Sequence, residues 1–67
     1  MSDAISEPIM QFFACEHLRE DLRSVSQPFG ELAQHIVNTL PRSAERSVSL
    51  RKILEAKDAA VRAKLAR

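Results

Sequence analysis

The stretch LREDLRSVSQPFGELAQHIVNTL, residues 18–40, decides the fold of this chain. Its apolar residues recur every three or four positions, which places them on one stripe of an α-helix. They are Leu18, Leu22, Val25, Phe29, Leu32, Ile36 and Leu40. Pro28 and Gly30 interrupt this stripe, because proline removes a backbone donor and glycine is a weak helix former. Since the apolar phase survives both, the pattern predicts one helix kinked near Pro28, or two collinear pieces with Ser26 capping the second.

A break in the helical pattern follows at Pro41, which disfavours helical backbone at Leu40. Ser43 can then accept hydrogen bonds from the first free amides of a new helix. From Ala44 onward, apolar residues again fall on one face, and several alanines raise the helix propensity. That face comprises Leu50, Ile53, Leu54, Val61 and Leu65, and the stem of Lys57 completes it. A second helix is therefore expected from Ala44 nearly to residue 67.

The part of the chain before Leu18 has no long apolar period. Residues 1–8 are expected to form a flexible tail with a cap at Ser6, and residues 12–17 a short leading helix or loop. No long run alternates polar and apolar residues, so strands are not expected. The predicted fold is all-α, a helical hairpin in one domain over residues 9–67. Because two helices make only one layer of contact, their apolar stripes predict a homo-oligomer.

The composition agrees with one small domain. The chain has 67 residues, 45% of them hydrophobic and 28% charged, with a single cysteine. A core of this size is marginal without subunit partners, a metal or disulfides. A single cysteine cannot form an internal disulfide, and the sequence shows neither a signal peptide nor about 18 consecutive apolar residues. A cytoplasmic protein is therefore expected.

The charges are distributed unevenly, although the net charge is only +1. Residues 1–41 contain two basic and six acidic side chains, whereas residues 42–67 contain eight basic and three acidic ones. One interpretation is an antiparallel pair of helices, within or between subunits, whose charges complement one another. The other is an anion site on the C-terminal half. The two are compatible.

Catalysis and metal binding find no support in the residue pattern. No motif surrounds the serines, the two histidines or Cys15, so no nucleophile and base are recognisable. Cys15 and His17 are two positions apart, which would point them away from each other on a helix, and no further soft ligands complete a zinc site. His35 is interpreted as a helix-flank residue. The sequence therefore predicts neither an enzyme nor a metal or cofactor site.

An aromatic pair and a group of cations are the candidates for ligand binding. Phe12 and Phe13 are adjacent, so both cannot face one core, and the second either packs on a neighbouring subunit or stacks on a nucleobase. His17 lies close by. Basic side chains gather at the start of the second helix, where free amides favour an anion such as phosphate, although a solvated charged face explains them equally well. They are Arg42, Arg46, Arg51 and Lys52, with Ser43 among them.

Three segments carry a resemblance to a known family. They are Phe13-Ala-Cys-Glu-His17-Leu18, Val25-Ser-Gln-Pro-Phe-Gly-Glu-Leu-Ala33, and residues 45–63, the most specific block. Together they resemble small phage proteins with the anti-CBASS and anti-Thoeris helical-hairpin domain, over nearly the whole chain after Glu7. The resemblance implies symmetric oligomers, often hexamers, that sequester cyclic nucleotide signals of bacterial defence systems.

The resemblance also assigns contact positions. The family's base-stacking aromatic falls on Cys15, where relatives often have Tyr, so Phe12 or Phe13 would replace it. A basic residue of the first long helix falls near residues 26–28, where this chain has none, and Arg23 is the nearest. The family's arginine at the start of the second long helix matches Arg46 within one residue.

The expected function is non-enzymatic sequestration of cyclic di- or trinucleotides in the cytoplasm of an infected bacterium, with Phe13 stacking, Arg46 on phosphate and His17 lining the pocket. The departures from the family pattern allow a different signal, including one derived from NAD. A protein-protein interaction module that uses the stripe of Leu50, Leu54 and Val61 is the alternative. Nucleic-acid binding through the basic last helix is weaker, because the net charge is low and no family motif for it occurs. No membrane partner is expected.

Overall fold

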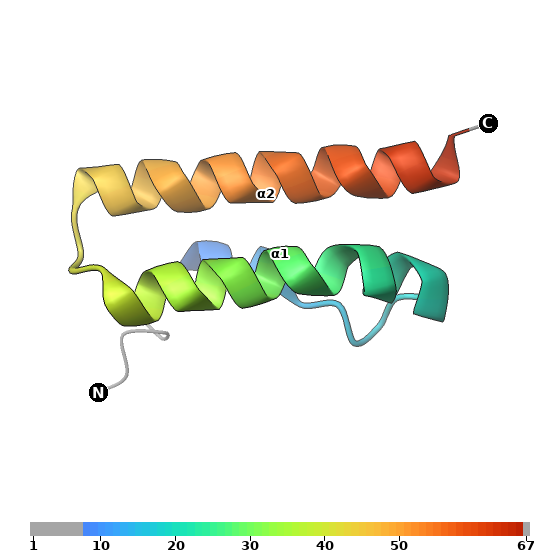
Figure 1. Ribbon diagram of the computed structural model, residues 1–67, viewed down its shortest axis with the longest axis horizontal. Helices are drawn as coiled ribbons and strands as arrows, with labels where there is room; N and C mark the ends of the chain where they lie inside the picture. Colours follow the sequence, from blue (N-terminus) through green and yellow to red (C-terminus); the bar gives the residue numbers. More distant parts are fainter. Residues whose placement is uncertain (1–7, 67) are drawn as a thin grey trace.

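Two long antiparallel helices and one short 3-10 helix form the structure, a computed structural model that describes residues 8–66 (Figure 1). The 3-10 helix η1 spans Pro8–Phe13, α1 spans Glu20–Thr39 and α2 spans Ala44–Leu65. η1 packs on one side of the α1/α2 hairpin. The predicted all-α hairpin is confirmed, and residues 8–66 contain no strand. Of the predicted tail, only Pro8 is described, as the first residue of η1; the cap at Ser6 lies outside the described residues.

The first turn of α1 is acidic, which suits the positive end of the helix dipole. The carboxylate of Asp21 accepts hydrogen bonds from the Leu22 amide at 2.9 Å and from the Arg19 guanidinium at 3.2 Å. Desolvation raises the pKa of Asp21, but the Arg19 charge and these hydrogen bonds lower it more, so the net pKa is lowered. The ionised carboxylate therefore stabilises the fold above the usual Asp pKa, and this contribution is lost as the pH falls through the lowered value.

α1 continues without interruption through Pro28 and Gly30, so the alternative of two pieces capped at Ser26 is wrong. The apolar stripe on both sides of Pro28 packs against α2, which holds the helix together despite one missing backbone hydrogen bond. Ser26 lies inside the helix and is buried. The kink at Pro28 stays a prediction. Gly30 lies where η1 approaches: a Cβ there would be 3.4 Å from the carbonyl oxygen of Phe13.

The leading segment differs from its predicted position. Helical structure begins at Pro8 and ends at Phe13, and residues 14–19 form no helix. The Phe13 side chain is only 6% exposed because it reaches the contact between the two long helices, where it packs with Ala33, Val37 and Leu50. Burial of this aromatic ring fixes where η1 ends.

The core is small. Its buried apolar members within residues 8–66 are Phe13, Ala33, Val37 and Leu50. Further apolar side chains pack around them while staying partly accessible; they are Ile9, Met10, Phe29, Ile36, Ile53 and Leu54. η1 therefore provides a third side to a core that two helices alone would leave open.

The predicted start of α2 is confirmed. Ser43 is the N-cap, and its Oγ accepts a hydrogen bond from the Arg46 amide at 3.0 Å. We expect Ser43→Ala to destabilise the fold by about 1 kcal/mol, because that amide loses its partner. The melting temperature should fall by about 4–8 °C. Ser43→Asp, which restores an acceptor, should melt close to wild type; an unchanged melting temperature for Ser43→Ala would contradict the cap.

Candidate functional site

Three pockets border η1 and collect most of the residues that the sequence singled out. We name each after one lining residue. The Phe12 pocket lies between η1 and the C-terminal half of α2, the Arg51 pocket between η1 and the N-terminal half of α2, and the Cys15 pocket between η1 and α1. The short 3-10 helix therefore shapes every one of these hollows.

The Phe12 pocket has a volume of about 390 Å³ and combines an aromatic ring with cationic and polar groups. Phe12 is 56% exposed, so its ring face is available to a flat ligand. His17 and Arg62 are exposed at the same pocket. The remaining lining residues are Gln11, Ala14, Leu18, Ser26, Lys57, Asp58 and Val61. Of the predicted ligand residues, this pocket unites Phe12, His17 and Ser26.

Lys57 connects this pocket to η1. Its Nζ donates a hydrogen bond of 2.7 Å to the carbonyl oxygen of Phe12 and lies 3.4 Å from a carboxylate oxygen of Asp58. The Lys57 side chain is only 13% exposed. The sequence interpretation of its stem as part of the apolar face is therefore confirmed, and its ammonium group holds the end of η1 against α2. Asp58 offsets part of its charge.

Ser26 brings an unsatisfied group to the same pocket. Its side chain is 1% exposed, and no described residue hydrogen bonds to its Oγ. Buried hydroxyl groups nearly always have a partner, and an ordered water, a ligand group or rotation of this side chain toward the carbonyl oxygen of Leu22 would each supply one. This is the one predicted ligand residue on α1 that reaches the Phe12 pocket.

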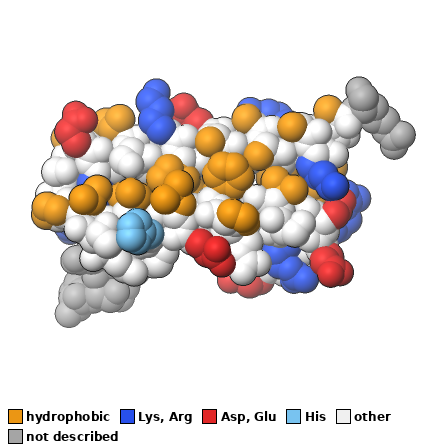
Figure 2. All heavy atoms as spheres, in the orientation of Figure 1, with side chains coloured by type: hydrophobic (Ala, Val, Ile, Leu, Met, Phe, Trp, Pro, Cys, Tyr) orange, Lys and Arg blue, Asp and Glu red, His pale blue; other side chains and the backbone are white. Residues whose placement is uncertain are grey.

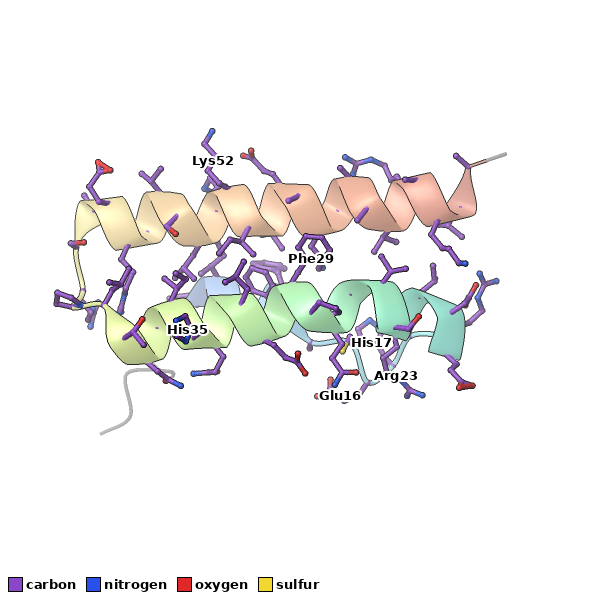
Figure 3. All side chains as sticks on the ribbon, in the orientation of Figure 1. Glu16, His17, Arg23, Phe29, His35 and Lys52 are labelled. Atoms are coloured by element: carbon purple, nitrogen blue, oxygen red, sulfur yellow. The ribbon has the colours of Figure 1, made fainter. Side chains whose placement is uncertain are left out.

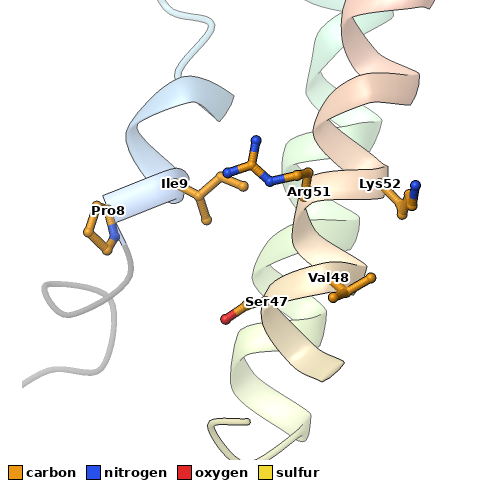
Figure 4. Close-up of a pocket in the computed structure, with 6 residues that line it drawn as sticks. All are labelled: Pro8, Ile9, Ser47, Val48, Arg51 and Lys52. Carbon is orange, nitrogen blue, oxygen red and sulfur yellow. The ribbon is translucent and has the colours of Figure 1, made fainter. Parts of the chain in front are cut away.

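The Arg51 pocket, about 540 Å³ in volume, holds two of the predicted cations. Arg51 extends from α2 toward Ile9 of η1, whereas Lys52 extends to the other side of the helix (Figure 4). Pro8, Ser47 and Val48 complete the lining. Arg51 makes no ion pair with any residue in the described range, while Lys52 lies 3.9 Å from Glu55. The two cations therefore do not converge on one anion.

The Cys15 pocket has a volume of about 490 Å³ and mixed charges. Cys15, Glu16, Arg23 and Glu31 line it, together with Met10, Phe13, Ala14, Gln27, Gly30 and Gln34. Glu16 belongs to the loop that joins η1 to α1, and Arg23 of α1 lies beside this loop (Figure 3). Two carboxylates against one guanidinium make this pocket unsuitable for an anion.

Arg46, the best match to the resembled family, has a different environment from the predicted one. Its side chain is 2% exposed, and its Nη1 donates hydrogen bonds to the carbonyl oxygens of Val37 at 3.2 Å and Leu40 at 2.8 Å. These carbonyls belong to the C-terminal end of α1, where a positive charge is favourable. The guanidinium thus joins the end of α1 to the start of α2, and its burial leaves little surface for contact with a phosphate.

The remaining predicted residues are dispersed. Phe13 is in the core, so it cannot offer a ring face, and Phe12 takes the exposed aromatic position. Arg42 is exposed in the turn between the long helices and lines none of the three pockets. His35 is exposed on α1, which confirms its interpretation as a flank residue.

Sequence reasoning missed Lys57 and Arg62 as pocket residues. Lys57 was explained by its stem alone, and Arg62 lies in an alanine-rich stretch far along the chain from Phe12. A sequence signal was available in part, because Lys57, Asp58, Val61 and Arg62 recur at helical spacing on one flank of the predicted second helix. The residues of η1 that lie opposite this flank could be identified only from the tertiary structure.

Two further observations concern metal binding and membrane insertion. Over residues 8–66, no group of three or more His, Cys, Asp or Glu side chains is arranged to hold a metal ion. Within the same range, neither long helix is apolar enough over sufficient length to cross a membrane.

Comparison with known proteins finds no matching family model, no similar curated protein and no similar solved structure.

Proposed function

We propose that the chain is a non-enzymatic, homo-oligomeric protein that binds cyclic di- or trinucleotide second messengers and sequesters them, and so blocks antiphage immune signalling in the cytoplasm of an infected bacterium. Sequestration breaks no bond in the ligand. It requires only a pocket that recognises both bases and phosphates.

The Phe12 pocket carries this proposal. It brings an exposed aromatic ring, two basic side chains, an imidazole and a buried hydroxyl without a described partner to one hollow. Flat apolar faces suit nucleobases, and cations suit phosphates. The pocket's volume of about 390 Å³ is near the lower end of the range for ligand pockets, so in this proposal a second subunit encloses the rest of the ligand.

Each group has a role in this proposal. Phe12 stacks on a base, and Arg62 makes a charge-assisted hydrogen bond to a phosphate. His17 lines the rim, and Ser26 Oγ hydrogen bonds to a polar atom of the ligand. Lys57 positions Phe12 through its bond to the backbone carbonyl and adds positive charge beneath the phosphate.

Thermal melting with a panel of cyclic di- and trinucleotides and cyclic ADP-ribose isomers tests the proposal. A ligand that binds only the folded protein raises its stability by about 2.7 kcal/mol at a hundredfold excess over Kd. For a domain of this size, the melting temperature should rise by roughly 10 °C or more. A panel that leaves the melting temperature unchanged would contradict ligand binding.

Arg62→Ala and Arg51→Ala form a matched pair of variants for locating the site. Both arginines are exposed on α2, but only Arg62 lines the Phe12 pocket. Loss of a charge-assisted bond should weaken binding by about 1.5–3 kcal/mol, or roughly 10- to 100-fold, in Arg62→Ala. Arg51→Ala should bind as wild type. The opposite order, measured by calorimetric titration, would move the site to the Arg51 pocket.

The alternative function is a protein-protein interaction module without a small ligand. The predicted stripe of Leu50, Leu54 and Val61 does not offer this surface, because Leu50 is fully buried. The apolar side chains that stay exposed on the hairpin, such as Leu32 and Leu40, favour the alternative instead. It predicts no melting shift with any nucleotide. Nucleic-acid binding, a third hypothesis, predicts an affinity that falls steeply with added salt.

A further inference from the structure

One face of the hairpin is apolar and has no covering element among the described residues. η1 packs behind the two long helices, and the opposite face shows a continuous band of hydrophobic side chains between α1 and α2 (Figures 1 and 2). We call this band the open face. On α1, the flank toward η1 carries Gln27, Gly30 and Gln34, which line the Cys15 pocket. The open face therefore belongs to the other flank of α1.

The α1 half of the open face is made of large side chains. Helical spacing on that flank groups Val25, Phe29, Leu32 and Ile36. Leu32 is 47% exposed, and the other three stay partly exposed even though Phe29 lies between the two helices (Figure 3). A soluble monomer would leave this stripe in contact with water.

The α2 half of the open face is made mostly of small side chains. The flank of α2 away from η1 groups Ile53 with residues that project little from the helix. These are Ser49, Ala56, Ala60 and Ala63. The open face is thus divided lengthwise into a raised half on α1 and a shallow half on α2.

Such a face is complementary to a rotated copy of itself. A two-fold axis parallel to the helices lays α1 of each copy on α2 of the other, so that raised halves meet shallow halves. A two-fold axis perpendicular to the helices would instead stack α1 on α1, large against large, and α2 on α2, with gaps between small side chains.

Charge favours the same arrangement. α1 contains three acidic side chains and one basic one, whereas α2 contains six basic and three acidic ones. Stacking α1 on α2 of the partner copy therefore opposes unlike charges, and stacking like helices opposes like charges.

The register supports particular pairs. Arg46 of α2 bonds to the carbonyl oxygens of Val37 and Leu40 at the end of α1. In this antiparallel pair, a residue of α1 and a residue of α2 therefore lie at the same height along the helix axes when their numbers sum to about 84. Rotation about an axis parallel to the helices preserves these levels. Asp21 then lies level with the partner's Lys64, for which the described residues offer no ion pair. Val25 and Leu32 lie level with the partner's Ala60 and Ile53.

We propose that a second copy of this chain covers the open face in a two-fold dimer in which α1 of each copy lies on α2 of the other. This inference rests on the homo-oligomeric part of the proposed function and is independent of its ligand. The dimer would be the unit from which any larger oligomer is built.

Light scattering coupled to size-exclusion chromatography tests the dimer on the full chain. The wild-type mass should be an even multiple of the chain mass of 7.5 kDa. Leu32→Glu puts a charge into the interface, so it should lower that mass at least twofold. The helical circular dichroism signal of this variant should be unchanged. Val48→Glu is the matched control, because Val48 is equally exposed, at 49%, but borders the Arg51 pocket. Its mass should not change.

Mixing two variants tests the arrangement. Ala56→Lys should also dissociate, since Ala56 is exposed on the shallow half and lies within one helical turn of the level of the partner's Leu32. An equimolar mixture of Leu32→Glu and Ala56→Lys should regain the wild-type mass through opposite charges. Failure of the mixture to associate would overturn the α1-on-α2 arrangement, and a monomeric wild type or an unaffected Leu32→Glu would overturn the dimer.

The nucleotide melting panel separates this inference from the ligand proposal. A dimer that Leu32→Glu dissociates, together with no nucleotide shift in the wild type, would leave the interface standing and remove the ligand. A nucleotide-induced rise in the melting temperature of a monomeric wild type would support the ligand proposal and remove the dimer.

Discussion

Replacement of Leu50 by alanine is expected to cause a large loss of stability in this fold. Leu50 is fully buried and packs in the core with Phe13, Ala33 and Val37. Removing its side chain beyond Cβ loses transfer free energy and leaves a cavity, which together cost about 2–5 kcal/mol. In a domain this small, the melting temperature should fall by roughly 10–30 °C.

Thermal melting followed by circular dichroism measures this effect, and Leu65→Ala is the control. Leu65 is the same residue type on the same helix, but it is 53% exposed near the end of α2. Its truncation should change stability by no more than about 0.5 kcal/mol. Equal losses in the two variants would contradict the position of the core described above.

The helical hairpin could be predicted because its signals are local. The apolar period of residues 18–40, the break at Pro41 and the serine at position 43 each depend on neighbours within a few positions. The extent of α2 and the Ser43 cap followed from these signals alone. Pro28 did not end α1, since tertiary packing on both sides of it outweighs one missing hydrogen bond.

The site was less predictable because its parts meet through tertiary contacts. Phe12 and Phe13 are equivalent by sequence, and only the docking of η1 decides that Phe13 is buried and Phe12 is exposed. Lys57 reaches the carbonyl oxygen of Phe12 across 45 positions of the chain. The periodicity of apolar residues does not predict a contact between positions so far apart, so Lys57 and Arg62 were missed as pocket residues.

Arg46 shows how one residue type supports two incompatible predictions. Read along the sequence, a cation at the start of α2 opposes the helix dipole and points to an anionic ligand. In the structure, the same guanidinium faces the end of the preceding helix, where Nη1 donates to two backbone carbonyls. There the positive charge satisfies acceptors that α1 leaves open at its C-terminus. The two roles predict different phenotypes.

Arg46→Met is expected to destabilise the protein by about 2–3 kcal/mol, because the buried carbonyl of Val37 and the partly buried carbonyl of Leu40 lose a charged donor. The melting temperature without ligand should fall by roughly 10–20 °C. Arg46→Lys should recover part of this loss, since it keeps a positive charge and three donors on a shorter side chain. Arg51→Met, at an exposed arginine of the same helix, should melt within a few degrees of wild type.

The phosphate role makes the opposite prediction. If Arg46 mainly held a ligand, Arg46→Met would melt as wild type in the absence of nucleotide and would lose only the ligand-induced rise. A lowered melting temperature without ligand, combined with a nucleotide-induced rise that survives in Arg46→Lys, identifies Arg46 as the residue that joins the two long helices. That outcome leaves Arg62, exposed at the Phe12 pocket, as the arginine available to a phosphate.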